Sequence, residues 1–258
     1  MLVNGRVFVV TGAASGLGYA TCKAIIGQRG KVIGIDMDAV LGAKLIAEFG
    51  ESSMFFAVAN ILDTQEITTA LENGSYKFGD IHGLINCAGI ILPRKVISSR
   101  GVTPLEDFQH VMNVNVVGSF NVVRLVSDRI SRQSSTSSSK ESGVIINVAS
   151  IAAFDGQIGQ SSYSASKAAI VGMTLPLARE LSSFGIRVMT IAPGLFATPM
   201  TATDLSKTTM ASVSSQVAFP KRPGHPDEFG KLCLSIIENS YLNGETIRLD
   251  GALRMSAL

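Results

Sequence analysis

Three side chains in the second half of the sequence have the types and spacing to move a proton to and from a substrate oxygen. Tyr163 and Lys167 are four residues apart, so on a helix they would share one face, and Ser150 precedes them. A free tyrosine has a pKa of about 10, and lowering it to about 7.5 requires roughly 3.4 kcal/mol of preferential phenolate stabilisation. Tyr163 would then act as a general base toward an alcohol or a general acid toward a ketone, with Ser150 donating a hydrogen bond to the same oxygen. Such a tyrosine-lysine pair is by itself more often a surface contact, so the interpretation depends on motifs elsewhere.

A glycine-rich loop near the N-terminus could hold the phosphates of a dinucleotide. It lies between an apolar stretch and a helix-like pattern, and its residues include Gly12, Ser15, Gly16, Leu17 and Gly18. Glycine is needed where the backbone approaches a pyrophosphate, whose charge the N-terminus of the following helix would stabilise. The spacing G-x-x-x-G-x-G differs from the commoner G-x-G-x-x-G, and a tight turn without a ligand is the alternative.

Asp36 predicts which dinucleotide binds. It ends the second apolar stretch, 18 residues beyond the last glycine of the loop, where a carboxylate can accept hydrogen bonds from the adenosine ribose. A 2′-phosphate there would be repelled by roughly 4 kcal/mol for each unit charge at about 4 Å, and the next residue, Met37, is not a cation. We therefore expect NAD(H), whose positive nicotinamide ring would join Lys167 in stabilising the phenolate. The alternative is that Asp36 only caps a helix beginning near Asp38.

A regular alternation of strands and helices must position these groups. Apolar residues make up 46% of the chain and charged residues 16%, which fits a sheet buried on both faces. Short β-branched runs separated by helix-length segments occupy residues 6–11, 31–36, 54–59, 83–86, 144–148, 187–192 and 246–249. The pattern predicts an α/β fold: a single Rossmann domain over residues 1–258, with a doubly wound seven-stranded parallel sheet and helices on both faces. Ligands of such sheets bind at the carboxyl ends of the strands.

Helix and loop signals agree with this alternation. Asp63 with Glu66 is expected to cap one helix, and Thr103 as N-cap with Pro104 in the first turn is expected to begin another. The serine-rich stretch 131–142 has no periodicity, so we expect an exposed, mobile loop inside the domain.

Composition and charge exclude several classes of partner. The 22 basic and 20 acidic residues are spread along the chain, so no basic stripe predicts nucleic-acid binding. The N-terminal apolar run is shorter than a signal-peptide core, and no apolar run approaches the roughly 18 residues of a membrane-spanning helix. We therefore expect neither secretion nor membrane insertion.

Cysteines and histidines do not predict a metal site. The cysteines are odd in number and far apart, which indicates reduced, buried thiols, and the histidines have no neighbouring ligands at metal spacing, which indicates solvated or loop positions. These residues are Cys22, Cys87, Cys233, His82, His110 and His225.

The joint pattern resembles the short-chain dehydrogenase/reductase family from end to end. Besides the glycine loop, the motifs that carry the resemblance are Asn86-Cys87-Ala88-Gly89, Asn115, Ser150, Tyr163, Lys167 and Pro193-Gly194. The resemblance implies that Asn115 bends its helix and holds a water that relays protons to Lys167, completing a catalytic tetrad with Ser150 and Tyr163. It also implies cofactor contacts, in addition to those of the loop and Asp36, from Asn60, Ile61, Asn86, Ala88, Gly89, Tyr163, Lys167, Pro193, Gly194, Phe196 and Thr198.

Two residues depart from the usual pattern of that family. Asn60 stands where an aspartate usually contacts adenine. Its amide oxygen can still accept a hydrogen bond, so we expect weaker rather than lost adenine recognition. Cys87 replaces the second asparagine of the more widespread N-N-A-G pattern.

A closer resemblance is to the type II 3-hydroxyacyl-CoA dehydrogenase subfamily, which shares Cys87. Segments 152–157, 172–176 and 242–245 carry it, together with the extra segment 93–104. It implies oxidation of (S)-3-hydroxyacyl-CoA, some acceptance of hydroxysteroids or other secondary alcohols, and a homotetramer. It also implies the mitochondrial matrix, although the N-terminus shows no Arg-rich presequence; the cytoplasm is the alternative.

Three features are expected on the substrate side. Apolar residues in segment 195–219 could form a lid over an acyl chain, or an ordinary amphipathic helix packed on the core. Gln157 could donate a hydrogen bond to the substrate or only pack in its loop. Arg94, Lys95 and Arg100 could meet a CoA phosphate or form a solvated loop.

Two rival functions are consistent with part of the pattern. An NADPH-dependent 3-oxoacyl-carrier-protein reductase would have the same fold, but Asp36 argues against it. A dinucleotide-binding scaffold that holds a partner protein or RNA would not need the intact tetrad.

Overall fold

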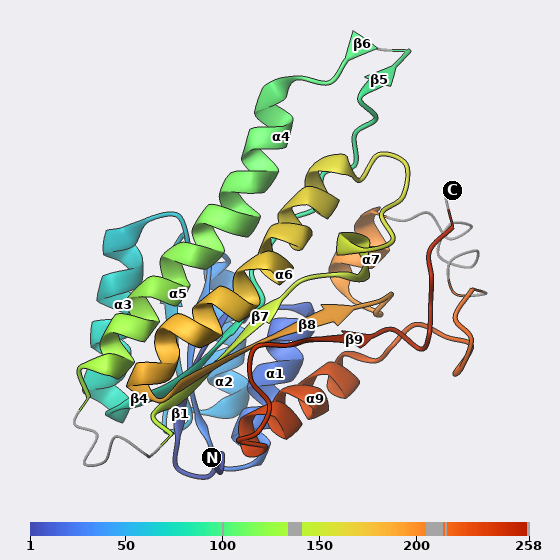
Figure 1. Cartoon of the computed structure of the whole chain (residues 1–258). Helices are drawn as coiled ribbons and strands as arrows, with labels where there is room; N and C mark the ends of the chain where they lie inside the picture. The colour runs from blue at the N-terminus through green and yellow to red at the C-terminus, as the bar shows by residue number, and fades with distance from the viewer. Residues whose placement is uncertain (100, 134–140, 205–213, 215, 257–258) are drawn as a thin grey trace.

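The computed structural model describes residues 1–99, 101–133, 141–204, 214 and 216–256. In this part of the chain the main sheet has seven parallel strands in the order β3-β2-β1-β4-β7-β8-β9 (Figure 1). The strands are β1 Val7–Thr11, β2 Lys31–Asp36, β3 Met54–Val58, β4 Ile81–Asn86, β7 Gly143–Val148, β8 Ile186–Pro193 and β9 Thr246–Leu249. The predicted strands and the doubly wound fold are confirmed.

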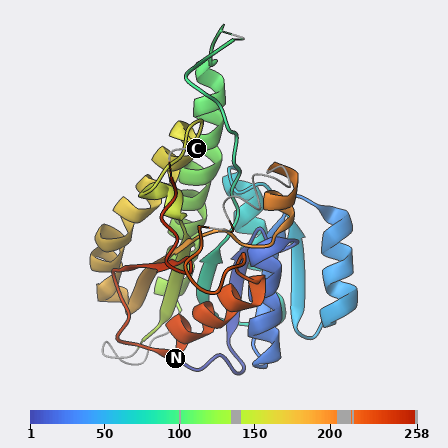
Figure 2. The same cartoon turned by 90° about the vertical axis from the view of Figure 1, so that its right-hand side faces the viewer.

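Helices cover both faces of the sheet (Figures 1 and 2). They are α1 Gly16–Gly27, α2 Ala39–Phe49, α3 Thr64–Phe78, α4 Leu105–Met112, the π-helix η1 Asn113–Gly118, α5 Ser119–Ser131, the 3-10 helix η2 Ile151–Ala153, α6 Ser161–Leu181, the 3-10 helix η3 Ser182–Phe184, α7 Pro199–Asp204 and α9 Pro226–Glu238. Side chains of α1, α2 and α9 form the core on one face, and those of α3, α5 and α6 form the core on the other. Alternate residues of β1 enter the two cores, because side chains of a strand point to opposite faces: Phe8 and Val10 into the first, Val7 and Val9 into the second.

One predicted helix cap is confirmed and the other is wrong. The carboxylate of Asp63 accepts hydrogen bonds from two backbone N–H groups in the first turn of α3, at 2.8 and 3.0 Å. The N-cap of α4 is Pro104, which makes no side-chain cap hydrogen bond. Thr103 does not cap α4 because its hydroxyl donates instead to the carbonyl oxygen of Lys95 at 2.5 Å.

That Thr103 contact closes the base of a small hairpin in the extra segment 93–104. The hairpin consists of β5 Ile97–Ser98 and β6 Gly101–Val102, which pair antiparallel. It projects beyond the sheet next to the start of α4 (Figures 1 and 2). Two-residue strands leave too short a pattern to be recognised in a sequence, and the sequence did not predict them.

Of the predicted loop 131–142, residues 134–140 lie outside the described part of the chain. The flanking residues continue from α5 and lead into β7. Within the described residues, no helix combines the length and the apolar character needed to cross a membrane.

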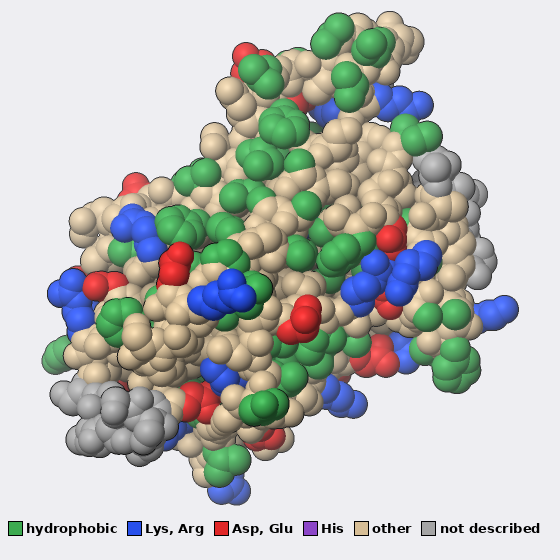
Figure 3. All heavy atoms as spheres, in the orientation of Figure 1, with side chains coloured by type: hydrophobic (Ala, Val, Ile, Leu, Met, Phe, Trp, Pro, Cys, Tyr) green, Lys and Arg blue, Asp and Glu red, His purple; other side chains and the backbone are tan. Residues whose placement is uncertain are grey.

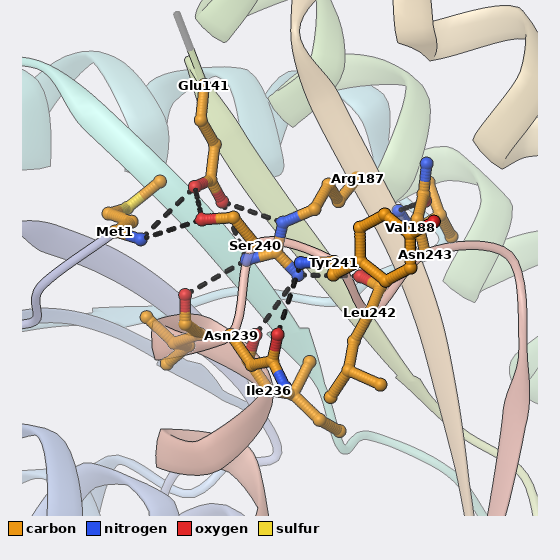
Figure 4. Close-up of polar contacts among 11 residues, drawn as sticks. Met1, Glu141, Arg187, Val188, Ile236, Asn239, Ser240, Tyr241, Leu242 and Asn243 are labelled. Carbon is orange, nitrogen blue, oxygen red and sulfur yellow. Dashed lines mark hydrogen bonds and ion pairs between the residues drawn. The ribbon is translucent and has the colours of Figure 1, made fainter.

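Arg187, on β8, ties the sheet to the end of α9 (Figure 4). Its guanidinium is almost fully buried and lies 2.6 Å from the carboxylate of Glu141. It also donates hydrogen bonds to the backbone carbonyls of Ile236, Ile237 and Leu242. The carbonyls at the end of a helix have no partner within the helix, so this arginine satisfies groups that would otherwise be buried and unpaired. Glu141 in turn accepts hydrogen bonds from Ser240 and from the amino group of Met1.

We predict that Arg187→Met lowers the free energy of unfolding by about 3–5 kcal/mol, because it removes the guanidinium from a part-buried carboxylate and leaves three backbone carbonyls without their arginine donor. Urea unfolding followed by circular dichroism measures the change. Lys23→Met is the matched control: Lys23 pairs with Asp227 on the surface, where an ion pair contributes at most about 1 kcal/mol. Equal effects of the two substitutions would contradict the assignment.

The same cluster predicts a pH dependence of stability. Burial alone raises the pKa of Glu141, but hydrogen bonds from Ser240 and Arg187 outweigh it and lower the pKa overall. A carboxyl with a lowered pKa adds stability above its unfolded value of about 4.3 and loses it as the pH falls through the folded value. The difference in unfolding free energy between the wild type and Glu141→Gln should therefore shrink as the pH falls from 6 toward 3. A constant difference over this range would refute the prediction.

Candidate active site

A cavity of about 610 Å³ opens at the carboxyl ends of the central strands. The chain segments that line it follow β1, β2, β3, β4, β7 and β8, as expected for a doubly wound sheet. The predicted residues that line it are Gly12, Ser15, Gly16, Leu17, Gly18, Asp36, Asn60, Ile61, Ala88, Gly89, Ser150, Tyr163, Lys167, Pro193, Gly194, Phe196 and Thr198. One cavity therefore brings together the predicted phosphate loop and the predicted proton-transfer groups.

The glycine loop has the shape of a phosphate cradle. Gly12 and Gly16 adopt φ angles of +63° and +54°, which side-chain-bearing residues rarely adopt. A Cβ on Gly18 would lie 2.0 Å from the carbonyl oxygen of Gly12, so only glycine lets α1 pack this closely on the loop. The N-cap of α1, Ser15, uses no side-chain hydrogen bond to satisfy the first N–H groups of the helix. Bare backbone donors at a helix N-terminus facing a cavity fit a pyrophosphate.

Asp36 lines the cavity at the predicted ribose end and also holds the loop in place. One carboxylate oxygen accepts a hydrogen bond from the backbone N–H of Ala14 at 3.0 Å, and the other accepts one from Met37 at 2.7 Å. The N-cap of α2 is Asp38, whose side chain accepts from Leu41. The alternative that Asp36 merely caps α2 is therefore wrong, because Asp38 has that role.

Asn60 and Ile61 line the cavity on the side of β3. The amide oxygen of Asn60 accepts a hydrogen bond from the backbone N–H of Leu62 at 3.0 Å, and its backbone N–H donates to Glu66 at 2.7 Å. Ile61 packs against Gly118, where a Cβ would lie 2.7 Å from its side chain. The two hydrogen bonds of Asn60 hold its side chain at the rim of the cavity. Its amide oxygen already accepts one hydrogen bond, from the backbone N–H of Leu62.

Asn86 does not line the cavity and is turned into the sheet. Its amide oxygen accepts from Thr11 at 2.8 Å, and its amide nitrogen donates to the carbonyl of Ser119 at 3.1 Å and to Asn147 at 3.4 Å. Thr11 also accepts from the backbone N–H of Ala88, at 3.1 Å. Asn86 therefore contributes to the site through a buried polar network that fixes the ends of β1, β4 and β7.

Tyr163 and Lys167 lie on one face of α6, as their spacing predicts. The Lys167 ammonium is 5.7 Å from the centre of the Tyr163 ring and donates a hydrogen bond to the carbonyl of Val148 at 2.8 Å. Burial lowers the pKa of Lys167 to about 8, although the charge of Cys87 acts to raise it. Burial raises the pKa of Tyr163, and a hydrogen bond with Ser150 opposes this. In the protein alone the Tyr163 pKa is thus raised, not lowered, because burial outweighs its polar neighbours.

Asn115 lies in the π-helix η1 between α4 and α5. Its amide oxygen accepts from the backbone N–H of Ile90 at 2.8 Å, and its amide nitrogen donates to the carbonyl of Ile90 and to the Ser166 hydroxyl. A Cβ on Gly89 would lie 3.1 Å from the Asn115 oxygen and 3.4 Å from the Lys167 nitrogen. Glycine at position 89 therefore keeps open the space where the two side chains approach each other, and the irregular helix agrees with the predicted bend.

The far end of the cavity is built by the chain after β8. The backbone N–H of Gly194 donates to the carbonyl of Leu249 at 2.9 Å, and Phe196 packs edge-on against Phe229 on α9. Thr198 precedes α7 and lines the cavity. Of the predicted lid 195–219, residues 205–213 and 215 lie outside the described residues, and the remainder includes α7.

The polar residues predicted on the substrate side, Gln157, Arg94 and Arg100, lie outside the cavity or outside the described residues. Gln157 does not line the cavity: its side-chain amide donates to the carbonyl of Ser256 at 3.2 Å. The Arg94 guanidinium pairs with Asp107 at 2.9 Å on the outside of α4, and Arg100 is outside the described residues. Among described residues, no group of three histidine, cysteine or acidic side chains could hold a metal.

Some of the cysteines and histidines lie where the sequence predicts, and others do not. Cys22 and Cys233 are buried as predicted, whereas Cys87 is half-buried and lines the cavity. His82 is not in a loop but in β4, where it accepts from the backbone N–H of Val7 and burial lowers its pKa to about 4. His110, on α4, lines the cavity, which the sequence analysis missed. His110 is one turn before Val114, another lining residue, but nothing in the sequence marks Val114 as part of the site, so this spacing becomes informative only with the structure.

Comparisons with known proteins agree with this geometry. The family model described as short chain dehydrogenase matches residues 6–209. The 3-hydroxyacyl-CoA dehydrogenase type-2 of Homo sapiens is 48% identical over 255 residues, covering 98% of this chain and 97% of that protein. The protein of the same name from Drosophila melanogaster is 45% identical over 98% of this chain and 99% of that protein.

A solved structure is similar along almost the whole chain. The crystal structure of 3-hydroxyacyl-CoA dehydrogenase type-2 from Mycobacterium avium has a TM-score of 0.90 and 33% sequence identity, covering 98% of this chain and 97% of that one. This chain belongs to the short-chain dehydrogenase/reductase family, whose dehydrogenases use a nicotinamide dinucleotide.

Proposed function

We propose that this protein catalyses the NAD-dependent oxidation of (S)-3-hydroxyacyl-CoA to 3-oxoacyl-CoA, and the reverse reduction. The observation that carries the proposal is the placement of Ser150, Tyr163 and Lys167 at one end of a cavity whose other end holds the glycine loop and Asp36. Identity of 48% over nearly the full length of relatives named for this activity supports the substrate class.

The geometry supports a simple division of roles during reduction of a ketone. When bound, the nicotinamide would supply the hydride to the substrate carbon. Tyr163, whose raised pKa keeps it protonated at neutral pH, donates its proton to the substrate oxygen. Ser150 donates a hydrogen bond to the same oxygen as charge develops there. In the oxidation direction Tyr163 accepts that proton, and the Lys167 ammonium stabilises the phenolate that must form first.

Asn115 is proposed to support this proton path by position. Its two hydrogen bonds to Ile90 hold the end of the chain after β4 against the π-helix. Its amide lies next to Ser166 and close to the Lys167 nitrogen across Gly89. A water between these groups would connect Lys167 to solvent, which is the relay that the family resemblance implies.

NAD rather than NADP is the proposed cofactor because of Asp36. Its carboxylate is held at the proposed ribose end by the backbone N–H groups of Ala14, Met37 and Asp38, so it cannot turn away from a 2′-phosphate without giving up these hydrogen bonds. Met37 is the neighbouring side chain that lines the cavity, and it carries no charge to neutralise such a phosphate. This argues against the reductase alternative, although a 3-oxoacyl-[acyl-carrier-protein] reductase of Thermotoga maritima is 34% identical to this chain.

The acyl-CoA substrate would enter past the described start of segment 195–219, which lines the cavity. The backbone N–H of Arg94 donates to Gly159, in the connection between Ser150 and Tyr163. We propose that Arg94 and the adjacent Lys95 meet the CoA phosphates, with Arg94 exchanging its Asp107 partner. Gln157 keeps only an indirect role, because its amide is bound to the chain terminus in this structure. Hydroxysteroids and other secondary alcohols remain proposed minor substrates.

We further propose that the protein forms a homotetramer in the mitochondrial matrix. Apolar side chains are exposed along α4, η1 and α5, and Figure 3 shows hydrophobic atoms over this face. They include Leu105, Phe108, Val117 and Phe120. Such a patch supports self-association, because monomers rarely expose large contiguous apolar surfaces. The proposed compartment rests on the subfamily resemblance alone, and the cytoplasm is the alternative. The rival function is a scaffold role without catalysis, which a measurement of activity distinguishes from the dehydrogenase.

We predict that Tyr163→Phe lowers kcat for the reduction of acetoacetyl-CoA by NADH by about 10²–10⁴-fold, because the proton donor is lost while the ring is kept. NADH binding, measured by fluorescence, should stay near the wild-type value. Tyr76→Phe is the matched control, since Tyr76 is 96% exposed on α3. Full activity of Tyr163→Phe would refute the mechanism, and an inactive wild type would favour the scaffold.

Asp36→Asn should weaken NADH binding by about 10- to 100-fold, because a charge-assisted hydrogen bond to the ribose contributes roughly 1.5–3 kcal/mol. The preference for NADH over NADPH should narrow at the same time, because the repelling charge is gone. Titration of both cofactors by fluorescence measures these effects. Asp38→Asn, which changes only the cap of α2, should leave both affinities unaltered; a similar loss in both variants would show that the effect is structural.

The lowered pKa of Lys167, about 8, predicts a pH dependence. As the pH rises through this value in the free protein, Lys167 loses the charge that supports proton transfer, so kcat/KM for reduction should fall. Steady-state rates between pH 6.5 and 9.5, with NADH binding measured at each pH, test this. A flat profile across the range would contradict the role of Lys167.

A further inference from the structure

Arg248 connects three segments at the substrate end of the site. It lies on β9, and its guanidinium contacts the carboxylates of Asp155 at 2.5 Å and Asp250 at 2.7 Å. It also donates to the backbone carbonyl of Leu253 at 3.0 Å, and it lies over the ring of Phe154, 5.3 Å from its centre. The Arg248 side chain is 21% exposed and that of Asp250 is 8% exposed, so screening by water is limited.

Asp155 belongs to the segment that carries the proposed proton-transfer groups. Ser150 begins the 3-10 helix η2, and Tyr163 stands in the first turn of α6, so residues 154–160 form the connection between them. Asp155 is tied to its own segment by a backbone hydrogen bond to Ile151. The ion pair with Arg248 ties it to the sheet. A shift of Asp155 would therefore be transmitted to Ser150 through one turn of helix.

Asp250 belongs to the opposite wall, at the proposed nicotinamide end. A Cβ on Gly194 would lie 2.8 Å from the Cβ of Asp250, so the two backbones are in direct contact. In the sheet register Arg248 pairs with Ala192, two residues before Gly194, and the N–H of Gly194 donates to Leu249. The same guanidinium therefore fixes the segment that bears Ser150 relative to the segment that bears Gly194.

The described residues after β9 pack against the same segments that Arg248 connects. In Figure 1 the chain after β9 rises along the right-hand side of the molecule. Leu253 is buried with Ile151 and Val217 in a small core of its own. The Ser256 carbonyl accepts from Gln157, so a second contact binds the same connection to the terminus.

We propose that Arg248 is a positioning residue for hydride and proton transfer: it sets the distance between Ser150 and the nicotinamide end through Asp155 and Asp250. The inference rests on the proposed function and assigns a residue that lies outside the cavity lining. Arginine is required because its planar fork reaches two carboxylates and a carbonyl in fixed directions. Lysine carries all its donors on one nitrogen and cannot reach Asp250 and Asp155 from the two separate positions that Nε and Nη2 of Arg248 occupy.

The experiment compares Arg248→Lys with the wild type as purified full-length protein. We expect kcat to fall by about 10- to 100-fold, the loss that a displacement of about 1 Å can cause. NADH binding should change little, because the adenosine end is untouched. The primary isotope effect with deuterated NADH should rise, since hydride transfer becomes rate-limiting; a loss of stability alone would not produce this.

Arg222→Lys is the matched control, because Arg222 makes a two-nitrogen pair with Glu228 outside the cavity lining. It should leave kcat and the isotope effect unchanged. Asp155→Asn is a second test that keeps Arg248 in place and should show part of the same loss. The double variant should be no slower than Arg248→Lys, because residues acting through one interaction are not additive.

The inference is overturned if folded Arg248→Lys keeps the wild-type kcat and isotope effect. It is equally overturned if kcat of Arg248→Lys falls only in proportion to a loss of NADH binding, or if Arg222→Lys shows the same fall in kcat. If Arg248→Lys does not fold, the result for Asp155→Asn decides. Failure of the proposed function is seen separately, in a wild type that does not reduce acetoacetyl-CoA, and the comparison is then made with whichever secondary alcohol a substrate panel identifies.

Discussion

Parallel pairing of the strands is the constraint on which the rest of the structure depends. Because β1, β2, β3, β4, β7 and β8 all run in one direction, the loops after them open at one edge of the sheet. The phosphate loop, Asp36, Asn60, Gly89, Ser150 and Gly194 come from sequence positions more than 180 residues apart and still line one cavity. The crossover of the strand order between β1 and β4 separates the loops and opens the crevice there.

A buried polar network keeps this edge in register. Thr11, Asn86 and Asn147 lie on three neighbouring strands, and their hydrogen bonds run across the sheet below the cavity. Burying polar groups is costly unless they are paired, so the network stabilises one arrangement of the strand ends over slipped alternatives. Only the side-chain oxygen of Asn147 takes part: among the described residues its side-chain nitrogen has no hydrogen-bond partner, which adds to the cost of the network.

Burial of the proposed proton-transfer groups, Tyr163 and Lys167, has a cost in solvation. Lys167 is almost fully buried, and its ammonium makes its hydrogen bond to a backbone carbonyl rather than to a carboxylate. Burial lowers its pKa to about 8, so this lysine can gain or lose a proton close to neutral pH. Tyr163 responds in the opposite sense, since burial favours the neutral phenol. The protein alone is thus set for donation of the tyrosine proton, and the reverse direction depends on added positive charge.

The sequence by itself determined the strands, the glycine loop, the carboxylate of Asp36 at the end of β2 and the helix face shared by Tyr163 and Lys167. These features depend on residues within one strand or one helical turn, where local geometry repeats. Tertiary structure decided which side chains reach the cavity: Asn86 turned into the sheet and His110 turned toward the cavity. It also decided that Arg248 meets Asp155, 93 positions earlier in the chain. Such contacts depend on how separate segments pack, and no periodicity within a segment encodes them.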